Sequence, residues 1–347
     1  MVVEIAVLLA AALAGGAVGA ALGARNALGL TGAVIAVGEA LVATSGEDAL
    51  DGIEVLPAPV DAVGLTAAVG VGPLFGPHVA FAGGAAAAAY EGRKRAIDTG
   101  FRYHQAKQIA APLYDSPRAL LIGAVFGLLG AGIAGLVGFL GAPLDPIALA
   151  VLVSALLHRF VFGYPMLGRL GSHNSLLDMS RFEAGEYWGD EDHETSQGIG
   201  GRHLVEPWQP EFDEWPAVVA IGAGVGLVAG GLAIATDSVF LAFGLAAAVL
   251  PAREWAAVPV PATYHVALPA GIAAIAVEGS VVSGIAVALI LGTVAAIVAE
   301  LAGRLLYAHG DTHLDPGFVS ILLTSVLIVA LVAAGLFDAS PVPYPTV

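Results

Sequence analysis

The stretch HVAFAGGAAAAAYEG occupies His78–Gly92, and the closely similar stretch HVALPAGIAAIAVEG occupies His265–Gly279. Nine of the fifteen positions are identical, including the histidine at the start and the Glu-Gly at the end. The two copies begin 187 residues apart in a chain of 347 residues. A match over this distance indicates that a whole structural unit is present twice, and such a duplication decides the fold.

The composition identifies the class of protein in which this unit is repeated. Hydrophobic residues make up 58% of the chain, and the mean hydropathy is +0.85. Several apolar runs reach about 20 residues, the length that a helix needs to cross a bilayer. These runs are Val2–Ala24, Ala119–Gly141, Pro216–Ala235, Val281–Glu300 and Gly317–Phe337. The sequence therefore predicts an all-α, polytopic protein of the cell membrane, with the lipid bilayer as its main partner.

The charged and missing residues exclude several other classes. Cysteine is absent, which excludes disulfides, thiolate zinc sites and iron–sulfur clusters. Acidic residues outnumber basic ones by 29 to 13, and Lys94 and Lys107 are the only lysines. Few lysines together with acid-rich loops are typical of a salt-adapted organism such as a halophilic archaeon. The net charge of −16 also argues against a nucleic-acid partner.

Two shorter matches extend the repeat toward the N-terminus of each copy. LAGG (Leu13–Gly16) is similar to VAGG (Val228–Gly231) at an offset of 215 residues. The same offset aligns Glu39 with Glu254. The fall from 215 to 187 implies about 28 extra residues in the first copy, within Thr44–Pro77, where loops accept insertions most easily.

A longer match extends the repeat toward the C-terminus of each copy. LDPIALAVLVSALL (Leu144–Leu157) is similar to LDPGFVSILLTSVL (Leu314–Leu327) at an offset of 170 residues. The fall from 187 to 170 implies 17 further extra residues within Arg93–Pro117. The matches keep one order along the chain, so we interpret the protein as a duplication.

Each copy is predicted to contain five helices. In the first copy they are Val2–Leu22, Leu28–Ala43, Pro77–Glu91, Ala119–Leu140 and Pro146–Phe162. In the second copy they are Pro216–Ala235, Val239–Pro251, Thr263–Val277, Val281–Leu305 and Gly317–Phe337. Some of them are too short to cross a bilayer alone, and Pro269 and Gly76-Pro77 are expected to break helices. The segment Val60–Phe75 is left open as a span, a re-entrant segment or a surface segment.

Basic residues predict the orientation. They cluster in Arg93–Arg118 and around the polar segment 164–214, and positive residues favour the cytoplasmic side. The sequence thus predicts a first repeat at 1–163, an acidic cytoplasmic loop at 164–214 and a second repeat at 215–347. Each repeat has five predicted crossings, and the chain has about ten in total. Because five is an odd number, the second copy enters the membrane from the opposite side, and the two copies are expected to be inverted.

Inverted repeats of this kind place a site at their interface, near the middle of the membrane. Ionisable residues buried there are costly and are candidates for function. The paired candidates for an ion pathway are His78 and His265, Glu39 and Glu254, Glu91 and Glu278, and Asp145 and Asp315. Glu300 and His158 are unpaired candidates.

Several of these candidates also have structural interpretations. Asp145 and Asp315 belong to LDP turns and would cap the helices that follow, with proline at the first helical position. Glu91 precedes a basic run and would lie at the membrane surface, and the two histidines would form caps or core hydrogen bonds. Glu39, within VIAVGEALVA (Val34–Ala43), has no charged neighbour and is the strongest candidate for a cation ligand or proton carrier.

Other chemical sites are less well supported. HGDTHLDP (His309–Pro316) is a cluster that could bind a divalent metal, but the sequence offers no identifiable further ligands. YWGDEDHE (Tyr187–Glu194) is interpreted as a solvated acidic surface, with a hard-cation cluster as the alternative. There is no P-loop, dinucleotide fingerprint or nucleophile elbow. We expect no metal site, cofactor or catalytic residue in this chain, and Na⁺ is the candidate transported ion.

A family resemblance adds to this reading. TAAVGVG (Thr66–Gly72), LLHRFVFG (Leu156–Gly163) and HLDPGF (His313–Phe318) resemble integral membrane subunits of tetrahydromethanopterin S-methyltransferase, most closely the D type. NSLLDMSRF (Asn174–Phe182) is similar to the E type. The resemblance implies a sodium-translocating membrane sector, driven in that family by methyl transfer on a cobamide that other subunits carry. This chain is longer than one such subunit and its acidic loop differs, so only the membrane sector and the ion carry over.

Two functions remain as hypotheses. The first is translocation of a cation, Na⁺ or H⁺, through the membrane. The alternative is a non-transporting membrane subunit that docks a cytoplasmic partner through the loop at 164–214. Under neither hypothesis is the chain catalytic by itself, although it would suit a membrane subunit of a methyltransferase-like complex. Further copies of the chain or related membrane subunits are the expected protein partners.

Overall fold

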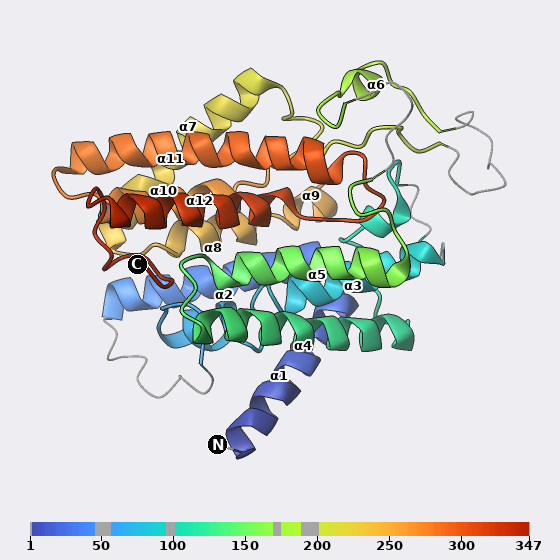
Figure 1. The fold of residues 1–347 in the computed structure, drawn as a ribbon, viewed down its shortest axis with the longest axis horizontal. Helices are drawn as coiled ribbons and strands as arrows, with labels where there is room; N and C mark the ends of the chain where they lie inside the picture. The colour runs from blue at the N-terminus through green and yellow to red at the C-terminus, as the bar shows by residue number, and fades with distance from the viewer. Residues whose placement is uncertain are drawn as a thin grey trace.

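The computed structural model describes residues 2–45, 57–94, 97, 101–168, 175–188 and 201–346, apart from the side chains of residues 2, 3 and 254. Over these residues the chain is all-helical (Figure 1), and it contains no strand beyond an isolated bridge between Tyr187 and His203. The all-α class predicted from the sequence is therefore confirmed.

Helices occur at every segment where the sequence predicts one. The first half contains α1 (Val2–Leu22), α2 (Ala24–Ser45), α3 (Ala80–Arg93), α4 (Pro117–Phe139) and α5 (Pro146–Phe162). The short helix α6 (Ser180–Glu183) lies between the halves. The second half contains α7 (Trp215–Thr236), α8 (Leu241–Ala248), α9 (Ala252–Trp255), α10 (Tyr264–Ala276), α11 (Val281–Ala302) and α12 (Pro316–Ala333). A π-helical turn, Gly303–Tyr307, extends α11, and α12 ends four residues before the predicted Phe337.

Six helices in the described part of the chain are long and apolar enough to cross a membrane. They are α1, α2, α4, α7, α11 with its extension, and α12, while α5 and α10 are shorter apolar helices. Large apolar side chains such as Leu121, Val228 and Val282 are exposed on the outside of this bundle. Exposed apolar surface of this extent suits contact with lipid, so the helices are compatible with a membrane location.

The two halves are packed from helices in the same chain order. In the first half α1, α3 and α4 pack against one another, and α5 packs on α3 and α4. In the second half α7, α10 and α11 pack against one another, and α12 packs on α10 and α11. The halves meet where α2 packs on α8 and where α5 packs on α12.

Glycines allow the closest of these helix contacts. A Cβ added to Gly16 of α1 would lie 2.2 Å from the carbonyl oxygen of Gly123 in α4. A Cβ added to Gly226 of α7 would lie 2.6 Å from the carbonyl oxygen of Ala288 in α11. Without side chains at these positions the helix backbones approach closely, as is usual in membrane bundles.

The segment before α3 is buried but is not a continuous helix. It contains a single π-helical turn, Thr66–Gly70, which packs on α2. Its start lies at the same end as the C-terminal tail, since the N–H of Asp61 donates to the carbonyl of Pro343. The hydroxyl of Thr31 in α2 donates to the carbonyl of Phe75. The segment thus leads from the C-terminal end into α3, and its interpretation as a span, a re-entrant segment or a surface segment stays a prediction.

One predicted helix break is confirmed and one is wrong. Gly76 and Pro77 lie in the turn that precedes α3, as expected. Pro269, in contrast, lies inside α10, which continues through it. The proline removes only the bond to the carbonyl four residues earlier, and membrane helices tolerate this loss where neighbouring groups surround the backbone. The second half breaks instead between α8 and α9, next to Pro251.

The bundle has two distinct ends (Figure 1). The C-terminal end comprises residues 57–62, 140–145, 277–280 and 334–346. The polar end comprises residues 101–116, 201–214 and 308–315. At the polar end Lys107 and Glu206 form an ion pair of 2.6 Å, and Arg202 binds Asp311 at 2.9 Å. These contacts hold the described part of the long polar loop against the helix bundle.

Candidate functional site

Glu39 is the centre of a polar site inside the bundle. It lies in the second half of α2, and 7% of the residue is exposed. The hydroxyl of Thr66 donates a hydrogen bond to its Oε1 at 2.6 Å, and the hydroxyl of Ser238 donates one to its Oε2 at 2.5 Å. Each carboxylate oxygen thus has a hydroxyl partner.

Local structure brings these two hydroxyls to Glu39. Thr66 begins the π-helical turn, and this turn approaches α2 at Gly38, where an added Cβ would lie 2.8 Å from Thr66 Oγ1. Ser238 lies just before α8, and its Oγ also accepts a hydrogen bond from the N–H of Leu241 at 3.0 Å. The site therefore joins one hydroxyl from each half of the chain to a single carboxylate.

The electrostatics of this site are unusual for a buried acid. Within the described residues, Glu39 forms no ion pair with a lysine, arginine or histidine. A charged carboxylate that is buried without a cation is costly, so Glu39 is a candidate ligand for a cation. Carboxylate and hydroxyl oxygens are the hard donors that such a cation prefers.

From the second half, Glu39 is contacted by Ser238, a position that the repeat does not align with it. Glu254 belongs to α9, and its side chain lies outside the described residues. Ser238 and Thr66 were not predicted as site residues, since Ser238 follows the polar residues Thr236 and Asp237 and Thr66 is a single uncharged residue in an apolar stretch.

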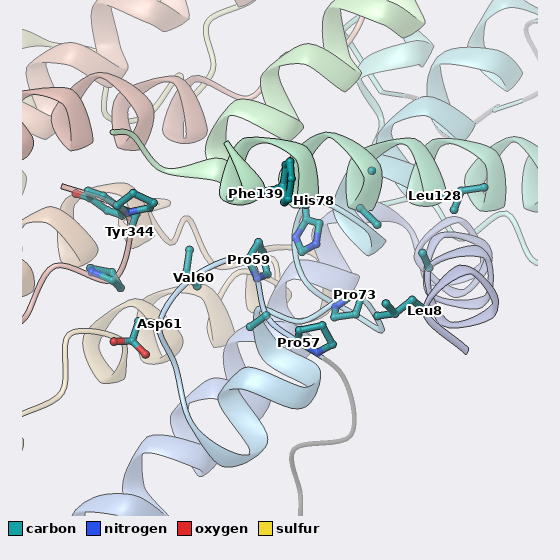
Figure 2. Close-up of a pocket in the computed structure, with 18 of the residues that line it drawn as sticks. Leu8, Pro57, Pro59, Val60, Asp61, Pro73, His78, Leu128, Phe139 and Tyr344 are labelled. Atoms are coloured by element: carbon teal, nitrogen blue, oxygen red, sulfur yellow. The ribbon is translucent and has the colours of Figure 1, made fainter. Parts of the chain in front are cut away.

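The two predicted histidines lie in different surroundings. His78, just before α3, is buried and lines a cavity of about 920 Å³ near the C-terminal end (Figure 2). His265, at the start of α10, is also buried, with its ring 5.3 Å from that of Trp208. The Nδ1 atom of each histidine lacks a hydrogen-bond partner. The structure thus does not bring these two histidines to Glu39.

Glu91 and Glu278 also differ from each other. Glu91 lies near the end of α3, is buried, and accepts a hydrogen bond from the hydroxyl of Ser116 at 2.6 Å. Glu278 is exposed in the turn between α10 and α11. The aligned sequence positions therefore do not form equivalent polar sites.

Asp145 and Asp315 are helix caps, as the sequence predicted. Asp145 accepts a hydrogen bond from the N–H of Ala148, and Asp315 accepts one from the N–H of Phe318. Proline follows each of them at the first helical position. Asp315 has additional partners, because the hydroxyl of Tyr264 donates to it and His313 Nε2 lies 3.1 Å away. Any role of these residues in an ion pathway stays a prediction.

The unpaired candidates have other polar partners. Glu300 binds Arg304 at 2.6 Å, one turn further along the same helix. His158 Nε2 lies 3.1 Å from the hydroxyl of Thr312. The same hydroxyl accepts a hydrogen bond from the buried guanidinium of Arg159 at 2.9 Å. The contacts of His158 and Arg159 link α5 to the turn before α12, whereas the pair of Glu300 and Arg304 lies within α11 and its extension.

The two possible metal clusters gain no support. Within the described residues no group of three or more His, Asp or Glu side chains could hold a metal ion. In HGDTHLDP, Asp311 pairs with Arg202 while Asp315 caps α12. Most of YWGDEDHE, from residue 189 onward, lies outside the described residues.

The comparison with known families adds an assignment over almost the whole chain. Residues 1–345 match a family of unknown function, DUF7973. No curated protein and no solved structure matches the chain. The resemblance to methyltransferase membrane subunits therefore stays a prediction. Because the family match covers almost the whole chain, the chain belongs to the DUF7973 family.

Proposed function

We propose that the protein is a membrane transport protein that carries Na⁺ or H⁺ between two inverted five-helix repeats, with Glu39 as the cation site. The observation that carries this proposal is the buried carboxylate of Glu39, which contacts one hydroxyl from each half and no basic side chain in the described part of the chain. A site at the junction of two repeats becomes accessible from either face when one repeat moves against the other.

The packing of the helices supports two copies of one unit. The helices α1 to α5 have the same neighbours, in the same chain order, as α7, α8, α10, α11 and α12. In a membrane each set of five makes five crossings. The short helix α3 crosses together with the mostly buried segment before it, whereas the residues that flank α10 are mostly exposed.

The direction of the helices supports inversion of the copies. The turn between α4 and α5 lies at the C-terminal end, whereas the corresponding turn between α11 and α12 lies at the polar end (Figure 1). The basic run Arg93–Arg118 leads into the polar end, so we assign this end to the cytoplasm. The loop at 164–214 is then cytoplasmic, and the turn at Asp145 is outside.

The chemistry of the site supports a small cation as the cargo. An ionised Glu39 and two hydroxyl oxygens supply one negative charge and hard oxygen ligands, which suit Na⁺. A proton is the alternative cargo for the same carboxylate. Competition between the two ions for one carboxylate would couple their movements in opposite directions.

The test is flux measured with the purified protein in proteoliposomes. Wild-type protein should take up Na⁺ when a pH gradient is imposed, and Glu39→Gln should abolish uptake because the amide keeps the shape but carries no charge. Glu278→Gln is the matched control, since this exposed residue lies away from the site. Uptake by Glu39→Gln at the wild-type rate would refute the assignment of the site.

A further inference from the structure

A large cavity lies near the C-terminal end of the bundle, away from Glu39. It has a volume of about 920 Å³, and its walls come from α1, α4, the segment Pro57–Asp61 and the tail Val342–Pro345 (Figure 2). Most of the lining is apolar, with side chains such as Leu8, Leu128 and Phe139. This volume is within the range of cavities that enclose small molecules.

The polar side chains of this lining are those of Asp61, His78 and Tyr344, and the imidazole of His78 is the most deeply buried of them. Figure 2 shows the ring of His78 between Phe139 of α4 and the prolines Pro59 and Pro73. His78 is 1% exposed, and its Nδ1 atom has no hydrogen-bond partner. The Nδ1 atom is closed off beside the backbone of Gly76, where an added Cβ would lie 2.8 Å from it, so a ligand in the cavity would meet the opposite edge of the ring.

The second half of the chain indicates which chemical group fits beside such a histidine. A cavity with the corresponding neighbours, α7, α10, α11 and His265, has a volume of only about 30 Å³. The indole of Trp208 lies against His265 there, with ring centroids 5.3 Å apart and planes tilted by 56°. The chain itself therefore places a planar apolar ring next to one imidazole and leaves the corresponding space beside the other open.

The shape of the open cavity also provides room for an extended chain. Gly132 and Gly135 of α4 line it, and a Cβ added to Gly132 or Gly135 would meet no atom within 4 Å. These glycines leave an apolar groove between α1 and α4, next to the exposed side chain of Phe139. A straight or branched hydrocarbon tail fits such a groove and continues into the surrounding lipid.

We propose that this cavity binds a membrane-soluble molecule of the isoprenoid quinone class. The planar ring lies against His78 and accepts or donates a hydrogen bond to the imidazole through a carbonyl or hydroxyl oxygen, and the tail lies along α4 at Gly132 and Gly135. This binding site does not depend on which ion is carried or on whether the protein transports at all, because the cavity is separate from Glu39 and its two hydroxyl partners.

Titration calorimetry of the purified full-length protein in detergent tests this site with decylubiquinone, a quinone ring on an alkyl chain. Decanol has the same chain without the ring and serves as the control ligand.

His78→Phe keeps an aromatic ring but removes the hydrogen bond, and it should weaken binding about tenfold. Gly132→Leu should abolish binding, because the new side chain fills the groove without a clash. Gly224→Leu is its control, since Gly224 of α7 also has open space around it.

The outcomes separate a specific site from general lipid binding. Saturable binding of decylubiquinone to wild type and Gly224→Leu, but not to Gly132→Leu, supports the proposal. Equal binding of decanol would show that the cavity takes any hydrocarbon chain and would overturn it. Binding of decylubiquinone to Gly132→Leu with wild-type affinity would also overturn it. If His78→Phe fails to fold, Gly132→Leu still decides the question.

Discussion

The carboxylate of Glu39 accepts a hydrogen bond of 2.5 Å from the hydroxyl of Ser238, a residue 199 positions further along the chain. Glu39 belongs to α2 of the first half, and Ser238 lies directly before α8 of the second half. This bond lies where the two halves pack, between α2 and α8. Movement of one half against the other would change the surroundings of the carboxylate, which is what alternating access requires.

The two hydroxyl partners should set the affinity for the cation. Thr66→Val and Ser238→Ala each remove one oxygen and one hydrogen bond from the carboxylate. Hydrogen bonds to charged groups contribute about 1.5–3 kcal/mol, so each change should raise the half-saturating Na⁺ concentration roughly tenfold or more. Thr293→Val is the control, because that hydroxyl bonds only within its own helix, to the carbonyl of Leu289. An unchanged Na⁺ dependence in both variants would show that the hydroxyls are not ligands.

Close packing of α2 on α8 should be essential for the site. A Cβ added to Gly32 would lie 2.5 Å from the backbone nitrogen of Ala248 and 2.6 Å from the carbonyl oxygen of Gly244. Gly32→Ala should therefore destabilise the protein by about 1–3 kcal/mol, measured as a lower midpoint of thermal unfolding in detergent. At Gly231 the nearest atom to an added Cβ is the Ile285 Cδ1 atom at 3.8 Å, so Gly231→Ala should melt like wild type. Equal midpoints for the two variants would contradict the close packing.

The buried pair of Lys107 and Glu206 predicts a specific dependence of stability on pH. Burial lowers the pKa of the Lys107 ammonium to about 8, although the nearby Glu206 carboxylate raises it in part. In the unfolded chain the pKa of a lysine is about 10.4. Between these two values the unfolded chain binds more protons than the folded one, so this group adds stability as the pH rises through the window.

The pH effect is measured as the difference between wild type and Lys107→Met. At about 1.4 kcal/mol per pKa unit, the free energy of unfolding of wild type relative to the variant should increase by up to about 3 kcal/mol between pH 8 and pH 10.4. Below pH 8 the difference should be constant, because lysine is then protonated in both states. A difference that falls as the pH rises would show that the pKa of Lys107 is raised in the folded protein.

The inverted topology can be tested by labelling, because the chain has no cysteine of its own. Single cysteines at Pro143 and Glu278 occupy exposed positions at the C-terminal end, and one at Glu214 is exposed at the polar end. A membrane-impermeant thiol reagent added to intact cells should label the first two but not the third. Labelling of Pro143→Cys and Glu214→Cys from the same side would contradict the proposed topology.

Much of the fold could be predicted from the sequence because long apolar runs have few alternatives to a helix. The LDP turns were predictable in detail, since Asp and Pro at consecutive positions form a helix start by local geometry alone, as Asp145 and Asp315 do. The effect of Pro269 was not predictable. Whether a proline breaks a helix depends on the groups that surround its backbone, and these come from distant parts of the chain.

The candidate site could be predicted only in part. Glu39 was identifiable because an acid within an apolar helix is costly wherever the helix packs. Its partners could not be predicted. Glu39 and Ser238 lie 199 residues apart, and no repeat or periodicity in the sequence links the two positions. The duplication was also a poor guide to equivalence of sites, as Glu91 is buried against Ser116 while Glu278 is exposed.

The most direct test of the central claim is equilibrium binding of Na⁺ to the purified protein, because binding requires no turnover. Calorimetry with NaCl titrated into a sodium-free buffer should give saturable heat for wild type and for Glu278→Gln. Glu39→Gln should lose this heat, because the amide supplies no charge to the cation. Saturable Na⁺ binding of wild-type affinity in Glu39→Gln would contradict the central claim.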